Sequence, residues 1–218
     1  MSPLYEGKAK RLWTTENPMT LRMEFKNDAT AFNGEKKASF EHKGRLNNAI
    51  STLIYGYLER AGVPTHFVRQ LDETNVEVKK VTILMVEVIV RNVSAGSFCK
   101  RTGMEEGLTF SQPIIEFSYK SDALGDPLIN DDYIREMDLA TTNDMAHLRE
   151  MALKVNGFLT EMFANCGLRL VDFKLEFGRL VEDPSQIVLA DEISPDGCRL
   201  WDLTTGEKMD KDRFRRDL

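Results

Sequence analysis

The sequence has few cysteines and few histidines, and neither kind of residue is grouped. Its 218 residues contain three of each, and no CxxC pair occurs. Structural zinc sites use such residues in pairs at short spacing, so the sequence argues against a zinc site and indicates free thiols. Free thiols are typical of a reducing compartment, and we therefore expect a cytoplasmic protein.

Long apolar runs and an excess of basic charge are also missing. No stretch approaches the roughly 20 apolar residues that a membrane-spanning helix requires, and the first eight residues lack the apolar segment of a signal peptide. The net charge of −6 disfavours general nucleic-acid binding, which needs a clustered basic surface. A few local lysines and arginines are still enough to bind a phosphorylated small molecule. We therefore expect small-molecule partners, with neither a membrane nor a nucleic acid among them.

The composition is that of a globular protein, with 42% hydrophobic and 29% charged residues. Short segments rich in Val, Ile, Thr and Phe predict strands in the first part of the chain. The predicted strands span residues 4–13, 21–25, 65–71, 76–83 and 86–93. Apolar residues at three- and four-residue spacing predict one helix over residues 40–61, which Gly62 and Pro64 end.

The second part of the chain is richer in helix. Periodicity predicts helices over residues 131–137 and 143–164, with Thr142 as the N-cap of the second and Gly167 as its C-terminal stop. Two strands follow, over residues 169–177 and 186–192, and residues 119–130 are predicted to form a long loop of a length that is often functional. These elements predict an α+β protein with a mostly antiparallel N-terminal lobe (1–94) and a mixed α/β C-terminal lobe (95–218).

Acidic residues occur at regular positions in the two late strands. Because side chains alternate along a strand, one face of the first carries only apolar residues and the other carries Asp172, Lys174 and Glu176. The alternative interpretation is a solvated outer face. The second strand is apolar until Asp191 and Glu192, and a hairpin would place Glu176 beside Asp191. Two such carboxylates suit Mg²⁺, which proteins usually bind through one or two carboxylates together with substrate phosphates. Lys174 would screen the phosphate charge.

Two further segments are candidates for phosphate binding. In the N-terminal Tyr-Glu-Gly-Lys-Ala-Lys segment, Gly7 lets the backbone approach a phosphate while Lys8 and Lys10 reach its oxygens. Farther along, Ser97 is placed to cap a short helix beside Arg91, and a helix N-terminus binds anions. For each segment the alternative is an ordinary turn with surface bases. The GxxxxGK[ST] and GxGxxG nucleotide motifs are absent.

Seven segments, in order along nearly the whole chain, resemble the SAICAR synthetase family. They are LYEGKAKRLW, NDATAFNGEKKASFEHKGRLNN, VEVIVRNVSAGSFCKRTGMEEG, KSDALGDP, GLRLVDFKLEFG, DEISPDGCRLWD and KMDKDRF. The resemblance implies an ATP-dependent ligase that joins L-aspartate to 5-amino-1-(5-phosphoribosyl)imidazole-4-carboxylate (CAIR) and releases ADP and phosphate, in purine biosynthesis. It also implies an N-terminal lobe like the small lobe of protein kinases, ATP and Mg²⁺ in a cleft between the lobes, and a homodimer.

The resemblance further implies roles for individual residues. Residues that match the nucleotide site are Gly7, Lys8, Lys10, Lys80, Leu84, Met85 and Glu87, with the adenine hinge at Leu84 and Met85. Residues that match the imidazole-nucleotide site are Arg91, Ser97 and Arg199. Lys120, Asp126 and Lys174 match positions near the reacting groups, and Glu176 and Asp191 match the metal-binding carboxylates.

The chain departs from the family pattern at two places. Gly125 stands where the family usually has a histidine before the Asp-Pro of the loop, and family members generally continue beyond Leu218 into a terminal helix. Two other functions remain as alternatives. A kinase would need an HRD-type loop and a DFG motif, whereas the sequence has Asp-Phe-Lys at 172–174 and no HRD. A nucleotide-binding regulatory protein without turnover would be expected to lack the acidic pair of Glu176 and Asp191.

Overall fold

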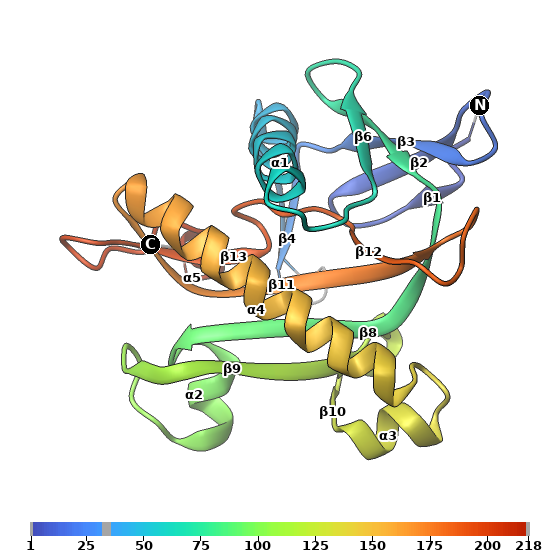
Figure 1. Cartoon of the computed structure of the whole chain (residues 1–218). Coiled ribbons are helices and arrows are strands. Elements are labelled where there is room, and N and C mark those ends of the chain that lie inside the picture. Colours follow the sequence, from blue (N-terminus) through green and yellow to red (C-terminus); the bar gives the residue numbers. More distant parts are fainter. Residues whose placement is uncertain (1, 32–35, 217–218) are drawn as a thin grey trace. The chain divides into compact units, whose positions relative to one another are not determined.

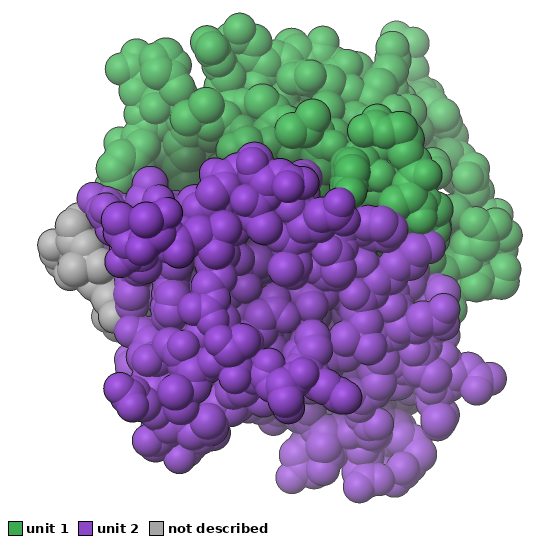
Figure 2. Space-filling model, turned by 60° about the vertical axis from the view of Figure 1, so that its left-hand side comes forward, with its two compact units in different colours: residues 1–83, 177–194 green, residues 84–176, 195–218 purple. Residues whose placement is uncertain are grey.

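The computed structural model describes residues 2–31 and 36–216, which form two compact units (Figures 1 and 2). Unit 1 comprises residues 1–83 and 177–194, and unit 2 comprises residues 84–176 and 195–218. The division falls inside two long strands, β8 (Val81–Val93) and β11 (Leu168–Leu180). The sequence predicted a nucleotide-binding lobe up to residue 94, followed by a lobe that binds the metal and the imidazole nucleotide. This functional division stays a prediction.

Unit 1 contains a five-stranded antiparallel sheet with one helix, α1 (Lys43–Arg60), packed on β3, β6 and β7 (Figure 1). In spatial order the strands are β1 (Tyr5–Glu6), β2 (Lys10–Thr14), β3 (Thr20–Phe25), β7 (Asn75–Lys79) and β6 (Phe67–Gln70). Alternate residues of β3 and β7 face the core, where Met23 packs with Val76 and Val78. The unit also holds the hairpin of β4 (Asp28–Ala31) and β5 (Lys36–Ser39), and β12 (Ile187–Ala190) beside β11.

Unit 2 is built on one sheet. Its strands are, in order, β10 (Leu128–Ile129), β9 (Thr109–Tyr119), β8 and β11, and β13 (Cys198–Asp202) pairs antiparallel with β11. Its helices are α2 (Ser97–Thr102), α3 (Asp131–Glu136), α4 (Thr142–Asn165) and α5 (Asp212–Arg216), with a 3-10 turn, η2, at Asp122–Leu124. Helix α4 lies across the sheet (Figure 1) and buries the stripe of Met145, Leu148, Met151, Ala152, Val155, Leu159 and Phe163. The predicted amphipathic face of this helix is therefore confirmed.

The start of α4 differs from the prediction by one residue. Thr141, not Thr142, is the N-cap, because its hydroxyl accepts the Asp144 N–H (3.1 Å) and the Asp144 carboxylate accepts the Thr141 N–H (2.8 Å). This reciprocal pair is a capping box, which satisfies two otherwise unpaired backbone donors. The predicted stop is confirmed, since Gly167 follows the helix with a left-handed φ of 74°.

The strand boundaries show the larger errors of the sequence analysis. Residues 84–85 were predicted to separate two strands, but β8 runs unbroken through them and the break falls at Lys80. Strands β9 and β13 were not predicted. Pro113 weakens the strand signal of β9, and β13 is only five residues long. The predicted loop 119–130 contains the 3-10 turn and the short strand β10.

The predicted fold class is confirmed at the level of an α+β protein with antiparallel sheets. Within residues 2–31 and 36–216, no helix combines the length and apolarity needed to cross a bilayer.

Candidate active site

The predicted site residues divide between the two units. Five of them belong to unit 1: Gly7, Lys8, Lys10, Lys80 and Asp191. Ten belong to unit 2: Leu84, Met85, Glu87, Arg91, Ser97, Lys120, Asp126, Lys174, Glu176 and Arg199. The predicted metal ligands Glu176 and Asp191 belong to different units, so their pairing stays a prediction. The structure does confirm that the two late strands, β11 and β12, are neighbours.

Four predicted residues meet in unit 2 as two carboxylates and two ammonium groups. Lys174 Nζ lies 2.5 Å from Glu87 Oε1 and 2.7 Å from Glu176 Oε1, and Lys120 Nζ lies 2.8 Å from the same oxygen of Glu176. Ser118 donates to the second oxygen of Glu87 at 3.0 Å. We call these four residues, Glu87, Lys120, Lys174 and Glu176, the acid–lysine cluster.

The acid–lysine cluster is buried on its acidic side and open on its basic side. The side chains of Glu87 and Glu176 are 7% and 5% exposed, whereas those of Lys120 and Lys174 are 34% and 38% exposed. A buried carboxylate is costly unless it is paired, and here each acid has an ammonium partner. The alternative of a solvated outer face on β11 is therefore wrong. The side chains of Lys120 and Lys174 are thus partly exposed to solvent, where a charged ligand would approach.

A second cluster in unit 2 joins two arginines through one aspartate. Arg91 donates to Asp172 at 2.7 Å, and Arg199 donates to both oxygens of Asp172 at 2.9 and 3.0 Å. The second terminal nitrogen of Arg91 lies 3.3 Å from the Ser97 hydroxyl. The structure therefore brings together all three predicted imidazole-nucleotide residues. Ser97, however, is the first residue of α2 and does not cap it, because Gly96 is the N-cap and no side chain caps the helix.

Three acids that fix these arginines were not among the predicted site residues. Asp172 was noted on the same strand face but was given no role. Glu116 of β9 accepts from Arg91 Nε at 2.7 Å and from Arg101 at 2.6 Å. Asp212 accepts from Arg199 Nε at 3.1 Å. Glu116 had no signal because β9 was not predicted, while the alternation along β11 could have identified Asp172.

The pKa values of two acids in the arginine cluster are shifted in opposite directions. Burial raises the pKa of Asp172 above its ordinary value, and the guanidinium groups of Arg199 and Arg91 oppose that rise. Burial also acts on Asp212, but there Arg199 and Arg215 outweigh it, and the pKa of that carboxyl is lowered. The arginines are therefore held by one acid with a raised pKa, Asp172, and by another with a lowered pKa, Asp212.

Gly96 leaves the space that the Arg199 guanidinium occupies. Its backbone has φ 56° and ψ −127°, a conformation that residues with a Cβ rarely adopt. A Cβ at this position would lie 2.5 Å from one terminal nitrogen of Arg199 and 2.7 Å from its central carbon. Position 96 therefore needs a glycine, because the Arg199 guanidinium packs against it.

Among the predicted residues of unit 1, Lys10 contacts Asp191. Lys10 of β2 forms an ion pair with Asp191 and lies 3.6 Å from a Glu192 oxygen. Gly7 lies in the turn between β1 and β2, where its N–H donates to the Lys10 carbonyl at 2.9 Å. Lys8 is exposed in the same turn. Lys80 lies between β7 and β8, and its N–H donates to Met19 O at 2.8 Å.

His66 also lies beside Asp191, although the sequence analysis gave it no role. Burial lowers the pKa of His66 to about 4; the Asp191 carboxylate opposes this shift, and Lys10 and Lys79 add to it. The imidazole is consequently neutral at physiological pH. No short-range sequence signal links His66 to Asp191, because the two residues lie 125 positions apart.

The remaining predicted residues of unit 2 lie at the edge of the acid–lysine cluster or in the loop that follows it. Met85 is exposed on β8, next to the buried Leu84, and its carbonyl accepts the Lys120 N–H at 3.1 Å. Asp126 has a φ of 49°, and its carboxylate accepts the Ser121 N–H at 2.9 Å. These contacts place Lys120 at the base of a loop that Asp126 closes.

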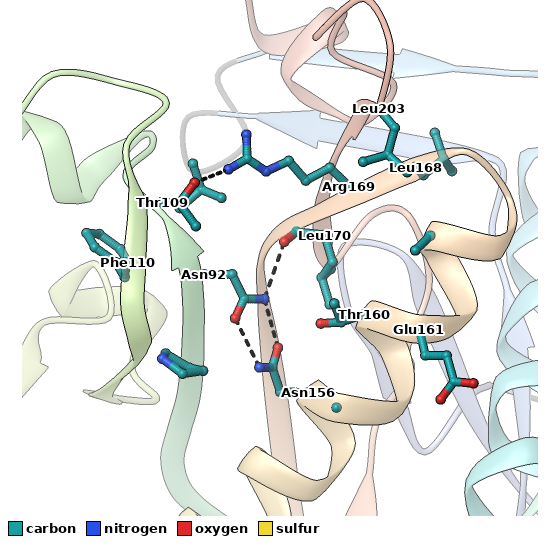
Figure 3. A pocket seen from close by; sticks show the side chains of 14 residues that line it. Asn92, Thr109, Phe110, Asn156, Thr160, Glu161, Leu168, Arg169, Leu170 and Leu203 are labelled. Carbon is teal, nitrogen blue, oxygen red and sulfur yellow. Dashed lines mark hydrogen bonds between the residues drawn. The ribbon is translucent and has the colours of Figure 1, made fainter.

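Unit 2 also has a pocket of about 520 Å³ that includes none of the predicted residues (Figure 3). Asn92 and Asn156 hydrogen-bond each other reciprocally at 2.8 and 3.0 Å on one wall, joining β8 to α4. Arg169 donates to the Thr109 hydroxyl at 2.5 Å on another wall. Asn92 follows Arg91 directly, so this amide pair fixes β8 next to the arginine cluster.

The donor set of the acid–lysine cluster fits a hard divalent cation. Among the residues that the structure describes, no group of three His, Cys, Asp or Glu side chains converges on one position for a metal ion. Mg²⁺ does not need such a group, since it keeps several waters and is usually held by one or two carboxylates together with substrate phosphates. Glu176, with Glu87 beside it, supplies carboxylate oxygens of this kind.

Buried acids paired with accessible lysines, next to a buried arginine cluster, are the arrangement expected of an enzyme that holds charged small molecules. A family model described as SAICAR synthetase matches residues 3–218. The chain belongs to the SAICAR synthetase family. This match covers nearly the whole chain and favours the ligase over the kinase and regulatory alternatives.

Named relatives agree with the family match. The phosphoribosylaminoimidazole-succinocarboxamide synthase of Akkermansia muciniphila is 65% identical over 218 residues, which cover 100% of this chain and 92% of that protein. A crystal structure of the same-named synthase from Ehrlichia chaffeensis is 45% identical, with a TM-score of 0.97 over 99% of this chain and 92% of that one. A SAICAR synthetase in complex with ADP is 46% identical, with a TM-score of 0.93 over 98% of this chain and 90% of that one.

Proposed function

We propose that the chain joins L-aspartate to the carboxylate of CAIR, with conversion of ATP to ADP and phosphate, as a step of purine biosynthesis. The observation that carries this proposal is the family match over residues 3–218. The relative solved with ADP supports a nucleotide as co-substrate. The buried acid–lysine and arginine clusters supply groups suited to the phosphates and carboxylates of these substrates.

The reaction needs an activated acyl group, because a free carboxylate has a poor leaving group. Transfer of the γ-phosphoryl group of ATP to a carboxylate oxygen of the imidazole gives an acyl phosphate and ADP. The amine of aspartate then attacks the acyl carbon, and the C–O bond to phosphate breaks. In this scheme Lys120 and Lys174 turn from their acids to the transferring phosphoryl group and stabilise its negative charge.

Mg²⁺ is the proposed metal, held by Glu176 and Asp191, and Glu87 is close enough to Glu176 to share in the site. The ion would neutralise charge on the ATP phosphates during transfer. Lys174 contacts both Glu87 and Glu176 and so balances part of their charge.

The arginine cluster is the proposed site for the imidazole nucleotide. Arg91 and Arg199 share Asp172, and their Nε atoms donate to Glu116 and Asp212, respectively. Guanidinium groups held in this way lose little entropy on binding a phosphate or a carboxylate. Arg91, Ser97 and Arg199 would therefore position the acceptor. The loop of Lys120 and Asp126 would lie near the reacting groups.

The nucleotide is proposed to contact the turn of Gly7, Lys8 and Lys10, with Lys80, Leu84, Met85 and Glu87 along the same site. In this proposal the N-terminal lobe resembles the small lobe of a protein kinase and ATP lies between the lobes. The antiparallel sheet of unit 1 and the exposed Lys8 support this part of the proposal.

A coupled assay of ADP release tests the proposed reaction. With ATP, Mg²⁺, CAIR and aspartate present, ADP should appear at a steady rate, and omission of CAIR should abolish it. ADP release that is the same with and without CAIR would contradict the proposal.

Oxygen-18 in the CAIR carboxylate tests the acyl-phosphate route. The C–O bond that breaks leaves one labelled oxygen in the released phosphate. Unlabelled phosphate would rule this route out while leaving the overall ligation intact.

A homodimer is proposed from the family resemblance. Light scattering should give twice the 24.9 kDa of one chain. A mass of 24.9 kDa at assay concentration would reject the dimer.

A further inference from the structure

The backbone of Asp191 has an uncommon conformation. Its φ is 62°, in the left-handed region that residues other than glycine seldom adopt, although aspartate tolerates it better than most. Asp191 directly follows β12, whose four residues are all buried. The direction of the Asp191 side chain depends on this backbone conformation, so whatever holds the conformation also aims the carboxylate.

Two side chains from distant parts of unit 1 converge on the Asp191 carbonyl. The Tyr55 hydroxyl, from α1, donates to Asp191 O at 2.8 Å and lies 3.1 Å from Ala190 O. His66 Nε2, from the segment before β6, lies 3.0 Å from the same Asp191 oxygen. A carbonyl oxygen can only accept, so the neutral imidazole carries its proton on Nε2.

The two donors are themselves held firmly. Tyr55 and His66 are both buried, with their rings in an edge-to-face contact at 5.5 Å. The Tyr55 ring also stacks on Phe67 at 5.9 Å. The His66 backbone N–H donates to Leu189 O at 2.9 Å, so the same segment is tied to the end of β12. Neither donor is able to turn away without breaking these contacts.

We propose that Tyr55 and His66 are positioning residues that hold the Asp191 backbone in its left-handed conformation and so aim its carboxylate at the metal–nucleotide site. This inference rests on the proposed function, which makes Asp191 a metal ligand. Hydrogen bonds behind a ligand commonly govern metal affinity, and removing one costs roughly 10- to 100-fold. Here they act on the ligand's own carbonyl rather than on its side chain.

A merely structural role for the pair makes a different prediction. If Tyr55 and His66 only fill the core beside β12, their hydrogen bonds affect the stability of unit 1 and leave the affinity for a metal–nucleotide complex unchanged. If they orient Asp191, affinity falls even in variants that remain folded. Binding of Mn²⁺-ADP therefore separates the two roles without any need for turnover.

The experiment compares variants of the full chain by isothermal titration with Mn²⁺-ADP. Tyr55→Phe removes one hydroxyl and keeps the ring, and His66→Leu removes the second donor. Each should weaken binding about 10-fold. His66→Gln keeps an N–H donor at a similar reach and should restore affinity. Tyr133→Phe and His147→Leu, at exposed positions of unit 2, are the matched controls and should bind like the unchanged protein.

Asp191→Asn separates failure of this inference from failure of the proposed site. If Asp191→Asn weakens Mn²⁺-ADP binding while folded Tyr55→Phe and His66→Leu do not, the positioning role is wrong and the metal assignment stands. If Asp191→Asn binds like the unchanged protein, the metal assignment itself is wrong. Circular dichroism at the titration temperature verifies that each variant is folded.

Discussion

At the scale of single residues, the two clusters of unit 2 alternate buried acids with basic groups. Glu176 lies between two ammonium groups, and Asp172 lies between two guanidinium groups. Removing one member leaves its partners uncompensated, which is more damaging than the loss of one contact. Substitutions in these clusters should therefore act on substrate binding and on catalysis more than their size suggests.

Glu176→Gln should lower the rate of ADP release by about 100-fold or more, because it removes a proposed metal ligand and the shared partner of Lys120 and Lys174. The amide has nearly the same shape, so the fold should persist. Glu182→Gln, at an exposed position, is the matched control. Turnover like that of the unchanged protein in folded Glu176→Gln would reject the role given to this carboxylate.

Gly96→Ala should raise the KM for CAIR by about 10-fold, because the new methyl group displaces the Arg199 guanidinium from Asp172 and Asp212. Gly103→Ala is the control, since Gly103 also has a positive φ but a Cβ added there would meet no atom within 4 Å. Steady-state measurement of the KM for CAIR in both variants distinguishes displacement of Arg199 from backbone strain. Equal KM values for both variants would show that backbone strain, rather than the arginine contact, is responsible.

The residues of these clusters could be predicted from the sequence to different extents. Alternation along β11 predicted that Lys174 and Glu176 share a face, and the structure joins them in one cluster. The family motifs singled out Arg91 and Arg199, but only the fold shows that Asp172 links them. Glu116 and His66 could not be found, because their partners lie 25 and 125 positions away and follow no periodic pattern.

At the scale of elements, the local sequence pattern predicted the helix α4 correctly but misplaced the boundaries of strands, which depend on long-range packing. The helix α4 followed its apolar periodicity because the stripe itself provides the buried face. The strand β8 continued through a predicted break because Leu84 and Val86 are both buried in unit 2. Strand boundaries depend on such partners, which single-sequence patterns do not report.

Thr141→Ala should lower the free energy of unfolding by about 1 kcal/mol, because it removes the capping box at the start of α4. Thr142→Ala, one residue later and also exposed, tests the N-cap that the sequence predicted and should change stability by less than about 0.5 kcal/mol. Urea denaturation of the two variants measures the difference. A larger loss for Thr142→Ala would mean that the sequence prediction was right.

At the scale of the whole molecule, the buried His66 links stability to pH. Its pKa is lowered to about 4 in the folded protein, from an ordinary 6.5, so the unfolded chain binds the proton more tightly. Stability should therefore be fully present above pH 6.5 and should fall as the pH drops toward 4. The expected loss from this one group is about 2 kcal/mol between about pH 7.5 and pH 5.0.

Urea denaturation at the two pH values checks this expectation. His66→Gln cannot take up the proton and should lose about 2 kcal/mol less than the unchanged protein over the same interval. His147→Gln, at an exposed position, should lose as much as the unchanged protein. An identical pH dependence in the His66→Gln variant would show that His66 is not the group responsible.

The central claim is that the two clusters and the nucleotide site together carry out one ligation. The most direct measurement is mass spectrometry of the product formed from ATP, Mg²⁺, CAIR and L-aspartate, with each substrate omitted in turn. We predict one product with the mass of CAIR plus aspartate minus water, formed in equal amount to ADP and only in the complete mixture. ADP without that product, or the product without ATP, would contradict it.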